Sequence, residues 1–174
     1  WYTSILGGMP SLDASAGDFM YPPSIVMHLL LPLHRALGMK MVLHVILAGI
    51  FFYALLVKGF KTKRIVGLAG AILYMSNPQF VSHAYPGHDG KMFVIAWLPF
   101  VIWRLKVMLD TPGIFNASMV SLGLAACFYT SHNQMTYFMA WGMFLYWCGH
   151  TYILWKKTKD IKTVGKTFLY FWGS

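Results

Sequence analysis

Residues 82–91 form the densest polar segment of the sequence, and they lie between two strongly apolar runs. The segment contains two histidines, a carboxylate and a lysine, namely His83, His88, Asp89 and Lys91. A loop at a membrane surface, or one that lines a wet cavity, accounts for such a cluster, whereas a lipid-facing helix does not. In such a loop His88 and Lys91 could contact a phosphate, and Asp89 could hold a metal ion or a substrate hydroxyl.

The same segment also has a plainer interpretation as a polar turn whose glycines supply positive φ angles. It is not a Walker phosphate-binding loop, because only two residues separate Gly87 from the Gly90-Lys91 pair, and that loop requires four. We favour a functional site, since an Asp and a Lys so close to apolar spans are costly in free energy.

Composition places the chain in a membrane. Of its 174 residues 57% are hydrophobic and 11% are charged, whereas soluble domains carry about 25% charged residues. The net charge of +9 could indicate a nucleic-acid-binding protein, but the basic residues cluster between apolar runs. That pattern is typical of the positive-inside rule of membrane proteins, so we expect no nucleic-acid partner.

We predict an all-α fold, a polytopic transmembrane helical bundle. Apolar runs predict five spans, near residues 41–57, 65–81, 92–109, 114–130 and 135–155, and residues 167–172 begin a further span. Within the fourth span Ala117, Ser121 and Ala125 repeat every four residues, which predicts close helix packing. The second span is interrupted by Asn77-Pro78, so it either bends and continues to residue 81 or stops part-way.

Residues 24–37 are apolar but short, since a helix over them would cover ~21 Å, less than the ~30 Å hydrocarbon core. We therefore predict a helix that lies flat at the membrane interface. The chain then reads as a single transmembrane domain over 1–174, with an outer-face loop and interfacial helix at 1–40 and transmembrane helices at 41–174. We expect it to be the front portion of a longer protein.

The positions of the lysines and arginines predict the orientation. Three basic segments, residues 58–64, 104–106 and 156–166, contain most of these side chains, and we place them on the cytoplasmic side. Residues 1–40, the 82–91 segment and the polar break at 131–134 then all lie on the outer face. We predict a multi-pass protein of the bacterial cytoplasmic (inner) membrane with its site on that face.

Histidines inside the apolar runs admit two interpretations. His44 and His150 could each be an axial ligand of haem or chlorophyll, but a hydrogen bond between helices is the commoner role of such a residue. His28 and His34 are six residues apart, so they do not form the i, i+4 pair of a zinc site. We predict no metal-ligand set from spacing, and we leave the cofactor open, a divalent cation being one option.

Several motifs in this chain resemble the YfhO-like family of multi-pass bacterial membrane proteins, which is related to GT-C-type glycosyltransferases. They are Gly-Gly-Met-Pro at 7–10, Tyr-Pro-Gly-His-Asp-Gly-Lys at 85–91 ahead of a proline-bearing apolar helix, and Ser-His-Asn-Gln at 131–134 followed by Met-Thr-Tyr. The last is similar to a Gly-His-Pro-Gln pattern of the family, with Ser131 in place of its glycine and Asn133 in place of its proline. The order of the spans is also similar.

The resemblance implies an enzyme that moves a sugar from a lipid-phosphate carrier to an acceptor on the outer face. In GT-C enzymes the catalytic base is a carboxylate in the first outer loop, for which Asp13 and Asp18 are the nearest candidates, although plain solvated or capping roles are about equally expected for both. We predict three catalytic residues, Asp13, Asp18 and Asp89. The predicted substrate-binding residues are His83, His88, Lys91, His132, Asn133 and Gln134.

The implied partners are membrane lipids, a polyprenyl-phosphate-sugar donor and other membrane subunits. Two alternatives remain open. The chain could be a non-enzymatic accessory subunit of a larger membrane complex, carrying pigment or haem through His44 or His150. It could also be a transporter with a site at the broken helix near Asn77-Pro78.

Overall fold

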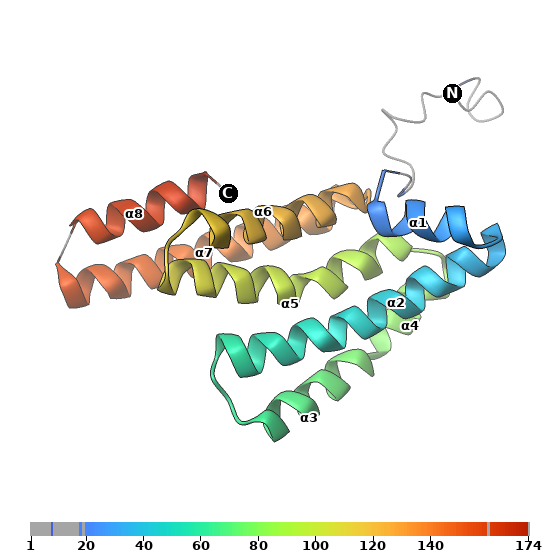
Figure 1. Cartoon of the computed structure of the whole chain (residues 1–174), viewed down its shortest axis with the longest axis horizontal. Helices are drawn as coiled ribbons and strands as arrows, with labels where there is room; N and C mark the ends of the chain where they lie inside the picture. Colours follow the sequence, from blue (N-terminus) through green and yellow to red (C-terminus); the bar gives the residue numbers. More distant parts are fainter. Residues whose placement is uncertain (1–7, 9–17, 19, 160, 174) are drawn as a thin grey trace.

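The structure is a computed structural model, and it describes Gly8, Asp18, residues 20–159 and residues 161–173. Every regular element in that part of the chain is helical, which confirms the all-α prediction (Figure 1). The elements are α1 (Pro22–Leu30), α2 (Leu33–Ala54), a π-helical turn η1 (Leu55–Gly59), α3 (Arg64–Met75), α4 (Pro78–Ala84), α5 (Asp89–Asp110), α6 (Ile114–Tyr129), α7 (Asn133–Thr158) and α8 (Ile161–Trp172).

Helix α5 is the centre of the bundle. It packs against α2 on one side and against α6 on the other, while α3 packs on α2. One buried cluster, which includes Val101 and Leu105 of α5 and Val120 of α6, joins α5 to α6 and α7. A second cluster, which includes Tyr21, Phe80 and Phe93, joins the segment before α1 to α4 and α5. The residues next to the N-terminal end of α5 are therefore held by packing from several directions.

Two of the described helical segments, Leu33–Gly59 and Asp89–Asp110, are long and apolar enough to cross a membrane, and Ile114–Tyr129 is a shorter apolar helix. Helix α7 has 26 residues, but its many Trp, Tyr and polar side chains keep it out of that class. The all-α part of the fold prediction thus holds, and the chain has helices suited to a membrane. The full set of five spans remains a prediction.

The prediction of one helix over residues 24–37 is wrong. Helix α1 ends at Leu30, and Leu31 adopts an extended backbone (φ −131°, ψ 151°) ahead of Pro32. A residue before proline avoids the helical region, which explains the break. Residues 33–40 begin α2 instead, so the predicted boundary between residues 40 and 41 falls inside that helix.

The predicted helix over residues 65–81 is divided in two. Helix α3 ends at Met75, and α4 begins at Pro78 after Asn77, whose side-chain Oδ1 accepts a hydrogen bond from the backbone N–H of Gln79. The proline and this side-chain cap restart the helix, as both residue types commonly do. Neither option left open by the sequence describes this fully, because the helix stops at Met75 but a second helix begins at Pro78 and continues past residue 81 to Ala84.

Polar and basic connections lie at opposite ends of the bundle. In Figure 1 the α1–α2, α4–α5 and α6–α7 connections are at the right. The connections that follow η1 and α5, and the C-terminal end of α7, are at the left, with the described residues of the three basic segments. The up-and-down course of the helices therefore separates the candidate site from the basic end.

Candidate functional site

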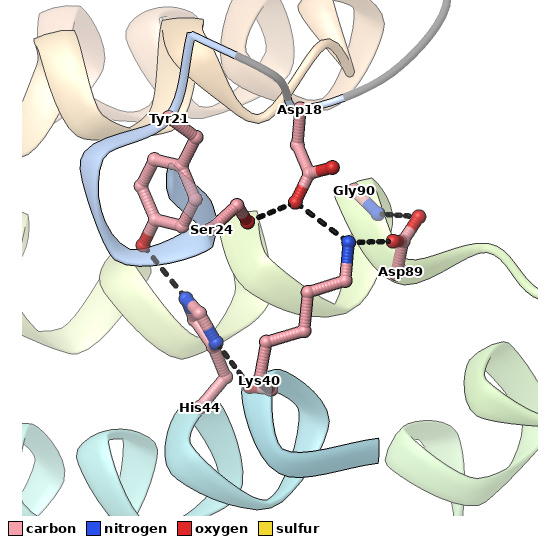
Figure 2. A network of polar contacts seen from close by, with 7 residues as sticks. All are labelled: Asp18, Tyr21, Ser24, Lys40, His44, Asp89 and Gly90. Carbon is pink, nitrogen blue, oxygen red and sulfur yellow. Dashed lines mark hydrogen bonds and ion pairs between the residues drawn. The ribbon is translucent and has the colours of Figure 1, made fainter. Parts of the chain in front are cut away.

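Lys40 of α2 lies between two carboxylates at the polar end of the bundle. Its Nζ atom is 2.8 Å from Oδ2 of Asp18 and 2.8 Å from Oδ2 of Asp89 (Figure 2). The lysine is 1% exposed, so its charge depends on these partners rather than on water. The bridge joins the segment before α1, the helix α2 and the first residue of α5. We call Asp18, Lys40 and Asp89 the charged triad.

Each carboxylate of the charged triad has a second hydrogen-bond donor. The hydroxyl of Ser24 donates to Oδ2 of Asp18, and the backbone N–H of Gly90 donates to Oδ1 of Asp89 at 2.9 Å. Burial opposes ionisation of Asp18, but the hydrogen bonds from Lys40 and Ser24 outweigh it and hold the pKa of Asp18 below its usual value. Asp18 is thus an anion at neutral pH.

The carboxylates of Asp18 and Asp89 differ in their exposure to solvent. The side chain of Asp18 is 13% exposed and that of Asp89 is 30% exposed. A carboxylate has about four acceptor sites on its two oxygens, so Asp89 can accept a further hydrogen bond from the exposed side. Of the two, Asp89 is the better placed to contact a substrate.

A directed chain of hydrogen bonds lies beside the charged triad. His44 Nδ1 donates to the carbonyl of Lys40 at 2.5 Å, which leaves Nε2 to accept from the hydroxyl of Tyr21 at 2.7 Å. The indole N–H of Trp97 donates to that same hydroxyl at 2.6 Å. The ring of His44 stacks on Phe93 with centroids 3.8 Å apart. The chain fixes the helical turn that carries Lys40.

This arrangement confirms the interpretation of His44 as a hydrogen-bonded residue. Both of its ring nitrogens contact protein groups and the residue is fully buried, so neither nitrogen is placed to ligate haem or chlorophyll. His150 lies far from the charged triad, with its Nε2 3.8 Å from Oδ1 of Asp110. Its Nδ1 is buried without a hydrogen-bond partner.

The 82–91 segment and the break at 131–134, both of which we predicted on the outer face, meet at Gly90. A Cβ atom added to Gly90 would lie 2.5 Å from the carbonyl oxygen of Thr130 and 3.5 Å from Cβ of His132. Within the segment the backbone N–H of His88 donates to the carbonyl of His83 at 2.9 Å. The start of α5 therefore sits directly against the turn between α6 and α7.

Basic side chains gather around this contact. Partial burial, followed by the charge of Lys91, lowers the pKa of both His83 and His132, and His88 contributes to both. Both imidazoles are consequently neutral at pH 7, and they can accept or donate a hydrogen bond next to the Lys91 cation. We call His83, His88, Lys91 and His132 the basic cluster.

Replacing Gly90 by alanine is expected to destabilise the protein by about 1–3 kcal/mol, because the added methyl group overlaps the Thr130 backbone. The matched control is Gly142→Ala in α7, where nothing lies within 4 Å of the added atom. That change should be neutral or stabilising by up to about 1 kcal/mol. Thermal unfolding of the two variants in detergent checks the contact, and equal stabilities would contradict it.

The other predicted site residues do not contact the charged triad in any hydrogen bond or ion pair described above. Asn133 and Gln134 are exposed in the first turn of α7, and Lys91 is half-buried in the first turn of α5. Asp13 lies outside the described residues. The structure thus brings Asp18, Asp89 and the basic cluster to one end of the bundle.

Lys40, Ser24, Tyr21 and Trp97 belong to the observed site but were not predicted from the sequence. A signal for Lys40 was present, because it is one of three basic residues, with Arg35 and Lys91, that lie outside the three basic segments. A lone lysine inside an apolar helix is costly and marks a functional or paired residue. Ser24 directly follows Pro22-Pro23, a position typical of a helix start, whereas its hydroxyl donates a hydrogen bond to Asp18.

Asp18 and Asp89 are the carboxylates that could bind a divalent cation, but both contact the ammonium group of Lys40. No group of three or more His, Cys, Asp or Glu side chains suited to a metal ion occurs among the described residues. The arrangement instead offers two fixed carboxylates, an internal cation, and a nearby basic cluster. These groups can accept a proton and bind an anion.

Comparison of the chain with protein-family models, curated proteins and solved structures finds no match. The likeness to the YfhO-like family therefore remains a prediction that rests on its motifs.

Proposed function

We propose that this protein transfers a sugar from a lipid-phosphate carrier to a hydroxyl acceptor. The observation that carries the proposal is that Asp89, which is bound to Lys40, and Lys91, whose charge acts on His132, both lie at the start of α5, where Gly90 meets the α6–α7 turn. A carboxylate and a cation two residues apart on the first turn of α5 supply the two groups that such a transfer needs. The motif likeness to GT-C-related proteins points to the same reaction.

The chemistry assigns one role to each group. Asp89 accepts the proton of the acceptor hydroxyl while the hydroxyl oxygen forms a bond to the anomeric carbon of the sugar. The bond from that carbon to the phosphate oxygen breaks, and its electron pair stays on the leaving phosphate. Lys91 stabilises the charge that develops there, with His88 donating a hydrogen bond. Lys40 and Asp18 hold Asp89 in place, and Asp18 is the second candidate base.

We expect Lys91→Ala to lower sugar transfer by about 100-fold or more, since removing a donor to a developing anion commonly has that effect. Transfer of a radiolabelled sugar from polyprenyl phosphate into a cell-envelope acceptor fraction measures it. Lys63→Ala is the matched control, because Lys63 is an exposed lysine ahead of α3 at the basic end. Equal loss of transfer in the two variants would argue against a role for Lys91 at the phosphate.

The proposal includes the membrane arrangement. Five spans cross the bacterial cytoplasmic membrane, the basic segments lie inside, and the charged triad and basic cluster lie at the outer face. The separation of polar and basic connections in Figure 1, and the two helices long and apolar enough to span, support this orientation. Membrane lipids, a polyprenyl-phosphate-sugar and other membrane subunits are the proposed partners.

A transporter is the second candidate function, favoured by the break between α3 and α4. Broken helices line substrate sites in many transporters, and Asn77 lies at this break. Substrate-dependent flux in proteoliposomes, with no transfer of sugar to an acceptor, would favour the transporter over the transferase.

A further inference from the structure

An open groove of about 710 Å³ runs between α6 and α7, starting at the turn that joins them. One face of each helix lines the groove, because the lining residues recur every three or four positions. They are Ser121, Leu124, Ala125 and Phe128 of α6, and Asn133, Thr136, Tyr137 and Ala140 of α7. The volume is in the range of ligand-binding pockets, about 300–1,000 Å³. The groove is mostly apolar, with its amide side chain, Asn133, next to the turn.

Small side chains make the groove. The repeat of Ala117, Ser121 and Ala125 predicted close helix packing, and the structure confirms this only for Ala117, which is buried. Ala125 is exposed, as is Ala140 opposite it on α7. The two helices therefore leave a channel along their outer halves instead of closing on each other. From Asn133 to Ala140 the channel follows ~10 Å of helix.

His132 of the basic cluster lies at the turn end of this groove. His132 directly precedes the groove-lining Asn133, and its Cβ atom lies next to the backbone of Gly90. Lys91 follows Gly90, and its charge acts on His132. A ligand that complements both features has an anionic head, which meets Lys91 and His132, and an apolar tail, which lies along α6 and α7.

We propose that the α6–α7 groove binds the tail of a long-chain isoprenoid lipid whose phosphate head contacts Lys91 and His132. The inference rests on the proposed function, because it places the lipid-phosphate donor of that reaction. It goes further by assigning a tail site to residues distinct from those that handle the sugar and the phosphate.

The test is binding of three probes to the purified full chain: radiolabelled long-chain polyprenyl phosphate, the polyprenol that lacks the phosphate, and dimethylallyl phosphate, which has a short tail. Ala125→Trp fills the groove from α6, and Ala140→Phe fills it from α7 if the first variant folds poorly. Leu145→Trp is the control, since Leu145 is an exposed α7 residue that does not line the groove.

We expect Ala125→Trp to weaken polyprenyl phosphate binding about tenfold or more, which corresponds to lost contact for about two methylene groups. Dimethylallyl phosphate should bind Ala125→Trp and the unaltered protein equally, and polyprenol should bind the unaltered protein less tightly than its phosphate does. Equal binding of polyprenyl phosphate to Ala125→Trp, Ala140→Phe and Leu145→Trp would overturn the groove assignment.

Measuring both lipid binding and sugar transfer in the groove variants and the unaltered protein distinguishes failure of the groove assignment from failure of the transferase proposal. If the groove variants lose polyprenyl phosphate binding while the unaltered protein transfers no sugar, the groove assignment holds and the transferase proposal fails. If the groove variants bind and transfer normally, the transferase proposal holds and the groove assignment fails. Failure of the unaltered protein to bind any of the phosphates would overturn both.

Discussion

Lys40→Met is expected to destabilise the protein by about 3 kcal/mol, because it leaves the partly buried carboxylates of Asp18 and Asp89 side by side without their shared cation. Methionine fills nearly the same volume, so the effect reports the charge rather than a cavity. Removing one partner of a buried ion pair is usually more costly than replacing the whole pair. Thermal or urea unfolding in detergent measures the change.

The triple variant Lys40→Met, Asp18→Asn, Asp89→Asn supplies the control. It removes all three charges, so we expect it to recover much of the stability lost in Lys40→Met, a coupling that unconnected residues do not show. Lys63→Met, which alters an exposed lysine, should change stability by less than about 0.5 kcal/mol. A Lys40→Met protein as stable as the unaltered one would show that the bridge contributes nothing.

Asp89→Asn should reduce sugar transfer by about 100- to 10,000-fold, the usual contribution of a general base. The fold should survive, because Lys40 keeps its contact with Asp18 and an asparagine oxygen can still accept a hydrogen bond from Lys40. The measurement pairs initial transfer rates with the unfolding temperature of the same preparation. The expected signature is a large loss of rate with a small loss of stability.

Asp110→Asn is the matched control for that substitution. Asp110 is also paired with a lysine, since Lys106 Nζ lies 2.8 Å from its Oδ2, but the pair is an exposed i, i+4 contact at the basic end of the bundle. Such pairs contribute about 0.3–0.5 kcal/mol. Transfer should therefore be unchanged in Asp110→Asn, and an equal loss in both variants would indicate a general effect of lost charge.

Periodic and compositional signals predicted the all-α architecture and the positions of most helices. Apolar runs mark α5 and α6 to within a few residues of their observed ends, since a long apolar segment in this chain has few alternatives to a helix. The clustering of lysines and arginines also predicted which connections share an end. Breaks within an apolar run were harder to predict. Pro32 divides residues 24–37 between two helices, but the residues on both sides of it are apolar, so hydropathy does not mark the division.

The charged triad illustrates what the sequence could not supply. Asp89 was singled out because it lies in a polar loop, and Asp18 was only one of two equal candidates. The predicted span begins at residue 41, so Lys40 falls just outside it. In the structure α2 begins at Leu33, and Lys40 lies inside this helix. Which lysine meets which aspartate depends on the packing of α1, α2 and α5, and no spacing rule within one segment encodes that contact.

The basic cluster was easier to foresee. Short connections force neighbouring helices together, so the 82–91 segment and the 131–134 break had to border adjacent helix ends. Their contact at Gly90 requires a residue without a side chain, and the sequence has one there. The groove below the turn was not foreseen, because small residues at every fourth position more often predict contact than space.

The most direct measurement for the central claim is sugar transfer from a radiolabelled polyprenyl-phosphate-sugar to a cell-envelope acceptor fraction. Purified unaltered protein, Asp89→Asn and Asp110→Asn are compared in proteoliposomes. We predict transfer by the unaltered protein and by Asp110→Asn at similar rates, and a loss of at least about 100-fold in Asp89→Asn. Normal transfer by a well-folded Asp89→Asn protein, or no transfer by any of the three, would contradict the account.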